Sequence, residues 1–511
     1  MSDDEVEDLL TDSRRQGARF AHDLEVAALI ESFGYNDRYA REKGFPDIFS
    51  MSEHLFPRLS QELTSGERLY QNRKQPAAST EIRHATGKFC LTLGYSIPWM
   101  ALLALEHLRP DVLRVSPELG GALSLSLIAS LIMTGGFVQI ICRRGNFYYG
   151  MREHSLARGS CMSLLNLGLT GSIFLALLAM ILGSYFHLFA GKYLVLAATN
   201  FLALSLLWML CAMLSVQGIG WCILCIFVFS ALISGLTDFL ADWNKSALAV
   251  LWPWTATFCA LGCVLGGFHR EAKKHTIRKN SPRPRLGVSF ISLIPFYVYG
   301  TAYFTFLFAD RLTAGSAIPW VSGLSFGIDV DYKQGMDLAL LIFLITAAIV
   351  EYLADSFLRF WHRLASKLPQ SAGERLITSL RRRHSQMMLV VFLSFVLTSS
   401  GAWFAFSHSS SLAASPKIMQ TAALGGLGYL MLSIPLLESI ILASVNAISM
   451  VVTALALGAG INLLTGYGFG HAWGVQYAAA GLLVGSAVVL WKCNAAVRHV
   501  LSNAAYHYSV S

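Results

Sequence analysis

The stretch LGVSFISLIPFYVYGTAYFTFLFA, Leu286–Ala309, is an apolar run that stops at Asp310-Arg311. A second apolar run, Met336–Ala354, follows a polar connection of 26 residues. Because an α-helix rises about 1.5 Å per residue, about 18 apolar residues are enough to cross roughly 30 Å of hydrocarbon. Both runs are therefore predicted to span a membrane. The chain before them and the chain after them follow similar plans, which makes this stretch the predicted junction between two halves.

The composition of the whole chain supports a membrane protein. Of its 511 residues, 54% are hydrophobic and only 14% are charged, whereas soluble domains carry about 25% charged residues. Residues 1–88 are the polar exception. We predict a cytosolic N-terminal extension there, acting as an appendage of the membrane part or as a docking segment for a partner. The spacing of Ile48, Met51, Leu55 and Leu59 predicts a short amphipathic helix within it.

Apolar length predicts an all-α polytopic membrane protein with about twelve spans. The spans are Phe89–Ala104, Gly121–Cys142, Met162–Phe186, Tyr193–Leu214, Ile219–Leu236, Ala247–Phe268, Leu286–Ala309, Met336–Ala354, Met387–Phe406, Ile418–Leu437, Ile440–Leu464 and Gly474–Trp491.

The connections repeat in the two halves. In each half a long basic loop joins the second and third spans, at 143–160 and at 358–386. In each half the fourth and fifth spans are separated by a tight turn, near Ser215 and near Glu438-Ser439. The basic linker 269–285 therefore separates two predicted six-helix lobes, an N-lobe at 89–268 and a C-lobe with a short tail at 286–511. Two such lobes related by an axis along the membrane normal are a recurrent plan of transporters.

Loop charge predicts the orientation, because Lys and Arg near the ends of spans are held on the cytoplasmic side. With the N-terminal extension inside, the inner connections hold 20 Lys and Arg and the outer connections hold 7. Both termini are therefore predicted to be cytoplasmic, in the cytoplasmic (inner) membrane. The net charge of +8 is thus a topology signal and a surface for anionic lipid, and it does not predict a nucleic-acid partner.

Several segments carry a family resemblance. They are the first span LGYSIPWMALLALEHL, the loop ICRRGNFYYGMREHSLARGS, the seventh span YGTAYFTFLFADRL and the eighth span DLALLIFLITAAIVEYLADSFLRFWHRL. In order and spacing, residues 86–500 resemble the Pel exopolysaccharide transporter (PelG-like) family of the multidrug/oligosaccharidyl-lipid/polysaccharide (MOP) exporter superfamily. One departure is Ile97, which stands where the family has a glycine before Pro98-Trp99. The N-terminal extension is a second departure, because members of the family begin close to the first helix.

The resemblance implies a MATE-like, V-shaped pair of six-helix bundles that alternate between inward and outward openings. It implies export of an exopolysaccharide, or its lipid-linked precursor, across the cytoplasmic membrane. The implied partners are the polysaccharide, membrane lipids, a cytosolic glycosyltransferase and other membrane subunits of a synthase complex. A multidrug or cation-coupled exporter of the same superfamily is the alternative.

Charged residues near the ends of spans are the first candidates for a gate. Asp310 and Arg311 form a gate or groove charge, or else a pair that caps the seventh span at headgroup level. Glu351 and Asp355 are one helical turn apart and share a face. They predict a cytoplasmic gate or proton relay, unless Asp355 simply pairs with Arg359.

Glu438 and Asn446 are the next candidates. The sequence places Glu438 in the tight turn between the tenth and eleventh spans, where an acid has a functional role or begins a helix. Further candidates for the substrate path are polar or aromatic side chains within the spans. The amides Gln139, Asn166, Asn200 and Asn462 are predicted to be buried, bonding across helices or lining the path, and Trp208, Tyr297, Tyr299 and Tyr303 to stack on sugar rings or to pack. The Gly135-Gly136 pair predicts close helix approach or bending.

The sequence excludes several other functions. The Cys222–Cys225 CxxC motif lies in an apolar run without a second pair, so no metal or other cofactor is predicted. An ATP-driven pump is excluded for this chain, because it has no GxxxxGK[ST] phosphate loop. A membrane enzyme that builds glycans needs a substantial outer loop with His, Arg or acidic residues, and the longest outer loop, 310–335, has no His. We therefore predict a transporter and not an enzyme.

Overall fold

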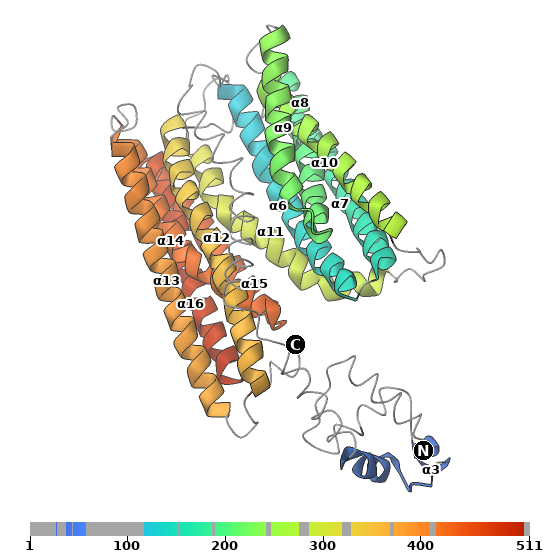
Figure 1. The fold of residues 1–511 in the computed structure, drawn as a ribbon. Coiled ribbons are helices and arrows are strands. Elements are labelled where there is room, and N and C mark those ends of the chain that lie inside the picture. The colour runs from blue at the N-terminus through green and yellow to red at the C-terminus, as the bar shows by residue number, and fades with distance from the viewer. Residues whose placement is uncertain are drawn as a thin grey trace. The chain divides into compact units, whose positions relative to one another are not determined.

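The computed structural model (Figure 1) describes residues 27, 37–42, 44–57, 117–151, 153–186, 190–241, 247–274, 286–318, 329–367, 373–407 and 415–504. The chain divides into two compact units, residues 1–85 and residues 86–511. The second unit holds all the described helices that are long enough to cross a membrane.

The first unit contains short helices. Helix α3, Asp37–Glu42, is followed by a helical stretch at 48–57. The carboxylate of Asp37 accepts the N–H of Ile48 at 3.1 Å and so ties the two helices together. Ile48, Met51 and Leu55 are buried, as their helical spacing predicted.

The second unit contains eleven long helices within the described residues. They are α6 Pro117–Gly150, α7 His154–Tyr185, α8 Gly191–Val216, α9 Trp221–Ala241, α10 Ala247–Lys274, α11 Leu286–Ser316, α12 Val330–Lys367, α13 Gly373–Ser407, α14 Pro416–Ser444, α15 Ile448–Trp473 and α16 Ala479–Ser502. A short 3-10 helix, Val475–Ala478, precedes α16.

These helices correspond in order to the predicted spans two to twelve, and the predicted first span, Phe89–Ala104, lies outside the described residues. Nine of the described helices are long and apolar enough to cross a membrane. The protein is therefore a multi-pass membrane protein, and the predicted all-α class is confirmed.

The helices are longer than the apolar runs that predicted them. The predicted span Met336–Ala354 corresponds to α12, which runs from Val330 to Lys367, and Asp310 lies inside α11 instead of ending it. Hydropathy underestimates the length of such helices. Their ends carry charged residues, which are satisfied outside the hydrocarbon or by neighbouring side chains.

The helices alternate in direction, so their ends gather on two sides of the unit (Figure 1). We call the side where α6 ends and α7 begins the basic end, and the other side the opposite end. The described basic residues near the basic end are Arg143, Arg144, Arg158, Arg270, Arg359, Arg363, Arg375, Arg381, Arg382, Arg383, Lys492 and Arg498.

Two turns at the basic end repeat the same geometry. Gly218, between α8 and α9, has φ 71°, and Asn446, between α14 and α15, has φ 59°. In the first turn Ile219 donates its N–H to Leu214 O, and in the second Ala447 donates to Leu442 O. This is the helix-ending motif in which a left-handed residue lets the chain satisfy the last carbonyls.

The second turn corrects one prediction. The sequence placed the break near Glu438-Ser439, but α14 continues through both residues to Ser444. Asn446 makes the turn because Asn is one of the few residues that readily adopt the left-handed conformation.

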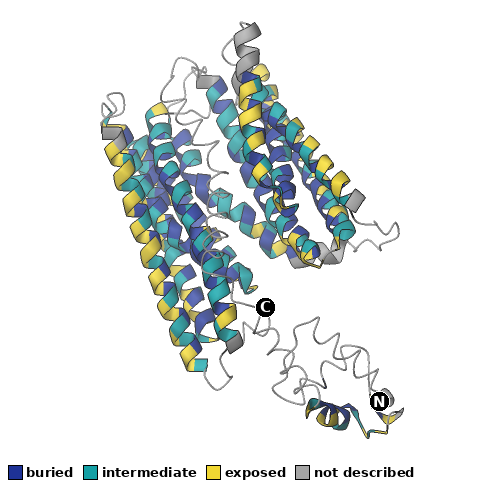
Figure 2. Ribbon diagram, viewed as in Figure 1, coloured by how far each residue is buried: buried dark blue, intermediate teal, exposed yellow. Residues whose placement is uncertain are grey.

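The helices pack as two groups, α6–α10 and α11–α16. Among the described helices, the main contact between the groups is the one between α6 and α11. Figure 2 shows buried residues on the faces that helices turn toward one another and exposed residues on the outward faces of α13 and of the α6–α10 group. Exposed side chains such as Phe174 and Leu397 are apolar, as expected where helices face lipid.

Candidate functional site

The crossing of α6 and α11 brings two backbones into direct contact. A Cβ atom at Gly300 of α11 would lie 2.6 Å from the carbonyl carbon of Gly135 of α6, and a Cβ at Gly135 would lie 2.8 Å from the Gly300 carbonyl oxygen. Neither residue can therefore be replaced by a larger one without moving a helix. This contact confirms the close approach that the Gly135-Gly136 pair predicted, and we call it the glycine crossing.

Aromatic and polar side chains surround the glycine crossing. Phe137 of α6 and Tyr297 of α11 meet edge to face with ring centroids 5.1 Å apart. The guanidinium of Arg143 lies 4.7 Å from the centroid of Phe296. Gln139, a predicted path residue, packs its Cγ beside Gly300 and is partly buried. All of these contacts lie in the half of α6 nearer the basic end.

The far half of α11 is held by the second helix group. The side-chain amide of buried Asn462 on α15 donates to Phe306 O at 3.0 Å. Beyond it, Thr313 packs so closely on Gly466 that a Cβ there would lie 2.8 Å from its hydroxyl oxygen. Helix α11 thus contacts α6 with its first half and α15 with its second half, so we call it the bridging helix.

A charged network lies around the second half of the bridging helix. The side chain of Asp310 is fully buried. Its Oδ2 accepts the hydroxyl of Tyr332 on α12 at 2.9 Å, and its Oδ1 has no hydrogen-bond partner among the described residues. A buried carboxylate is costly unless it is paired or hydrogen-bonded, because burial removes it from water, and acids at such positions are usually functional.

Arg311 extends this network across two more helices. It donates to Asp337 Oδ1 on α12 at 3.1 Å and to the hydroxyl of Tyr429 on α14 at 3.4 Å. Lys333 lies 3.6 Å from the other oxygen of Asp337. The structure thus places Asp310 and Arg311 inside the C-lobe among α11, α12 and α14, which ties three helices together.

A second buried ionisable group lies nearer the basic end of the C-lobe. Glu438 on α14 is fully buried, and His384 on α13 is 4% exposed. The His384 Nε2 lies 3.5 Å from Glu438 Oε1, and neither carboxylate oxygen accepts a hydrogen bond from the described residues. The next residue, Ser439, has its hydroxyl 3.3 Å from that of Tyr299 on the bridging helix. Glu438 is therefore next in sequence to Ser439, and the contact partner of Ser439, Tyr299, is next in sequence to Gly300 of the glycine crossing.

The remaining charged candidates lie at helix surfaces. Glu351 on α12 is exposed. Asp355 forms an ion pair with Arg359, one turn along the same helix, which is the simpler of the two arrangements that the sequence allowed. Asn446 is exposed and makes the α14–α15 turn.

The amide and aromatic candidates of the N-lobe bond mainly within it. Asn200 donates to Ser126 Oγ at 2.7 Å, and the Trp208 indole donates to Ser130 Oγ at 3.1 Å, both from α8 to α6. Asn166, predicted to be buried, is exposed on α7 instead. Apolar periodicity does not tell which face of a helix meets lipid when both faces are apolar. In the C-lobe, Tyr303 packs among aromatic rings. Its ring centroid lies 6.3 Å from that of Tyr299 and 5.5 Å from that of Phe304.

Sequence reasoning did not identify several partners in these networks. They are Tyr332, Lys333, Asp337, His384 and Tyr429. Asp337 and Tyr429 are 26 and 118 residues from Arg311, so no local spacing links them. The only local signal was a charge, imidazole or phenol in or beside an apolar run, and the same signal occurs at membrane surfaces.

Comparison with known proteins places the fold. No protein-family model matches the chain, and no curated protein matches it. Solved structures do. The Vibrio cholerae MATE transporter VcmN in its bent form has 14% identity over 85% of this chain and 100% of that one, with a TM-score of 0.57. The outward-facing conformation of a multidrug resistance MATE family transporter of the MOP superfamily has 11% identity over 84% of this chain and 97% of that one, with a TM-score of 0.54. This chain therefore has the fold of MATE transporters of the MOP superfamily.

Proposed function

We propose that this chain exports an exopolysaccharide, or its lipid-linked precursor, across the cytoplasmic membrane. Export proceeds by alternating access between the two helix groups. The observation that carries the transport proposal is the bridging helix, which joins both groups and contacts α6 by bare backbone at the glycine crossing. Two rigid groups that touch at such a contact can rock against each other by a shear of packed helices.

The choice of a polysaccharide rests on the sequence. The end of α6 with its basic aromatic loop, the aromatic bridging helix and the acid-aromatic-basic end of α12 all resemble the Pel transporter family. In the N-lobe, α7 and α8 carry no carboxylate and α6 carries only Glu118, in its first turn. Hydroxyl, amide and aromatic groups suit an uncharged sugar better than a cation, because they offer hydrogen bonds and apolar faces.

The two buried ionisable groups are the proposed switch elements. The Asp310–Arg311 network holds α11, α12 and α14 together, and the Glu438–His384 pair lies beside the α14–α11 contact. A change of protonation or hydration at either place would alter how the bridging helix packs. Glu351 and Asp355 are proposed as surface charges of a gate at the basic end.

The proposal includes a location and partners. The excess of Lys and Arg at the basic end supports a cytoplasmic position for that end and for both termini. A cytosolic glycosyltransferase would then deliver the glycan at the basic end, together with other membrane subunits. Export, and not catalysis, is the proposed activity of this chain.

A multidrug or cation-coupled exporter is the second candidate, because a similar solved structure is named a multidrug resistance transporter. Deleting the gene in its native host separates the two. Loss of cell-surface carbohydrate with unchanged drug tolerance supports the polysaccharide exporter. Normal carbohydrate with increased sensitivity to cationic drugs overturns it in favour of the drug exporter. Re-expression of the intact chain should restore whichever property is lost.

A further inference from the structure

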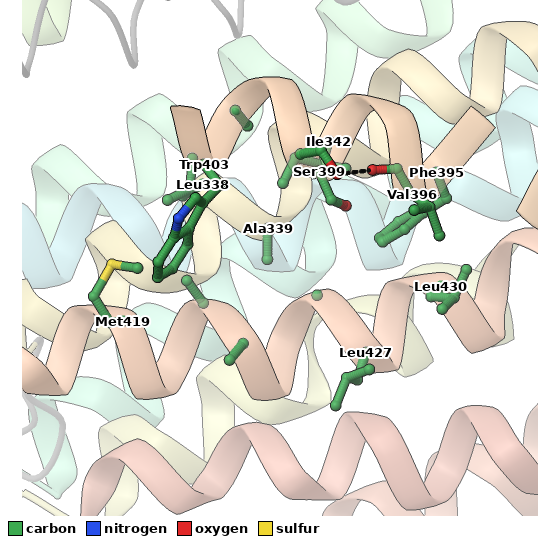
Figure 3. A pocket seen from close by; sticks show the side chains of 15 residues that line it. Leu338, Ala339, Ile342, Phe395, Val396, Ser399, Trp403, Met419, Leu427 and Leu430 are labelled. Carbon is green, nitrogen blue, oxygen red and sulfur yellow. Dashed lines mark hydrogen bonds between the residues drawn. The ribbon is translucent and has the colours of Figure 1, made fainter. Parts of the chain in front are cut away.

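The C-lobe contains an apolar groove between α12, α13 and α14. It has a volume of about 450 Å³, within the range of pockets that hold small ligands. Figure 3 shows Trp403, Leu338 and Met419 together in one part of it, with Phe395, Val396 and Leu430 in another. We call it the lateral groove.

The lining offers almost no polar group to a ligand. Apart from Ser399, Ser400 and the indole N–H of Trp403, the groove is lined by apolar side chains and a glycine, and the Ser400 hydroxyl already bonds Val396 O of its own helix. A ligand with polar groups would lose their hydrogen bonds to water there without replacement. The occupant must therefore be a hydrocarbon.

The groove faces the outside of the helix bundle. Its residues Val396, Trp403 and Leu427 are 42%, 63% and 49% exposed. In the apolar segment of α13 only 17% of the residues are buried, compared with 50% in that of α12 and 56% in that of α14. In a multi-pass membrane protein, exposed apolar side chains on spanning helices meet the bilayer, so the groove opens to lipid.

The dimensions and the charge at one end agree with a single lipid tail. Along α14 the groove runs from Met419 to Leu430, about 17 Å at the rise of a helix, and one leaflet contributes about 15 Å of the hydrocarbon core. Met419 is in the first turn of α14, and the exposed Lys417 is two residues before it. A lysine at headgroup level attracts a lipid phosphate.

We propose that the lateral groove binds one acyl chain of a phospholipid from the leaflet at the opposite end, with the lipid phosphate beside Lys417. The acyl chain fills the space between α13 and α14. These two helices contact each other less than either of them contacts α12. A bound phospholipid thus serves as a structural cofactor that holds α13 on the C-lobe. This inference is independent of the transported substrate.

One glycine makes the groove testable. A Cβ at Gly426, which lines the groove, would meet no atom within 4 Å. Gly426→Leu therefore places a side chain in the groove from a Cβ position that has no close contact. Gly460 on α15 is exposed, lies outside the groove and also has open space around it. Gly460→Leu is thus a matched control with the same gain in helix propensity.

The experiment follows thermal unfolding of the full-length protein in detergent, titrated with dioleoyl phosphatidylglycerol. The wild type and Gly460→Leu should gain about 5 °C at saturating lipid, and Gly426→Leu should gain less than half of that. Lys417→Gln, which leaves the groove open, should reach the full gain only at about fivefold higher lipid. Native mass spectrometry should show one phospholipid fewer on Gly426→Leu than on the wild type.

Two outcomes would overturn the inference. One is an equal gain for Gly426→Leu and the wild type. The other is a gain with a polyprenyl phosphate but none with phosphatidylglycerol, which would assign the groove to an isoprenoid chain. If Gly426→Leu does not fold, the smaller Ala423→Val, at another residue of the lining, and Lys417→Gln decide between these results.

Discussion

Glu438 and His384 face each other across 3.5 Å inside the C-lobe, from α14 and α13. Of the groups from other elements that face them, Arg498 and Cys493 come from α16 and Phe357 from α12, its ring centroid 6.4 Å from that of His384. Both side chains are buried, so each depends on neighbouring protein groups, and not on bulk water, to satisfy its polar atoms.

Removing both members of this pair should cost less than the sum of the two single removals. Glu438→Ala and His384→Ala should each destabilise the protein by about 3 kcal/mol, because each leaves a buried partner unsatisfied. A double-mutant cycle followed by chemical unfolding in detergent should give a coupling of about 1–3 kcal/mol. Additive effects in the cycle would show that the two groups do not interact.

Gly300→Ala should shift the equilibrium between states of the transporter. The new Cβ would collide with the Gly135 backbone, and overpacking of this kind costs about 1–3 kcal/mol. A cost of about 1.4 kcal/mol changes a population tenfold, so spin labels on α7 and α13 at the basic end should report a more separated population. Gly262→Ala, at a glycine with open space around it, is the control and should match the wild type. An unchanged distance distribution in Gly300→Ala would exclude the glycine crossing as the moving contact.

The Arg311–Asp337 ion pair should contribute far more to stability than the Asp355–Arg359 pair. The side chains of the first pair are 14% and 16% exposed, and those of the second are 33% and 26% exposed. Breaking a buried pair costs about 3–5 kcal/mol, whereas an exposed pair contributes about 0–1 kcal/mol.

The measurement compares the unfolding of Asp337→Asn with that of Asp355→Asn in detergent. The first variant should unfold at a clearly lower denaturant concentration. Similar midpoints for the two variants would mean that water or the Tyr429 hydroxyl satisfies Arg311 as well as Asp337 does.

The sequence could predict the helices because each contains an apolar run long enough to cross the hydrocarbon, although the helices themselves extend beyond those runs. It could not place Glu438 correctly, because an acid inside an apolar stretch resembles a break until His384 is brought against it from another helix. The turn at Asn446 depends on a left-handed backbone, which many residue types near it could have adopted at a cost. The sequence could not predict the lateral groove either. Part of its space exists because Gly426 has no side chain, and hydropathy does not report the shape of a helix surface.

Neutralising Glu351 and Asp355 together tests the proposed gate at the basic end. Glu351→Gln with Asp355→Asn removes two negative charges from one region of α12 and releases Arg359 from its ion pair. We expect an unchanged protein level, because a surface ion pair contributes little to stability. We expect lower export of glycan, because the proposed gate charges influence the equilibrium between the inward and outward openings. The measurement is secreted carbohydrate per amount of membrane-inserted protein. Asp331→Asn, which removes a charge from the first turn of the same helix at the opposite end, is the control. Wild-type export from the double variant would remove both residues from the mechanism.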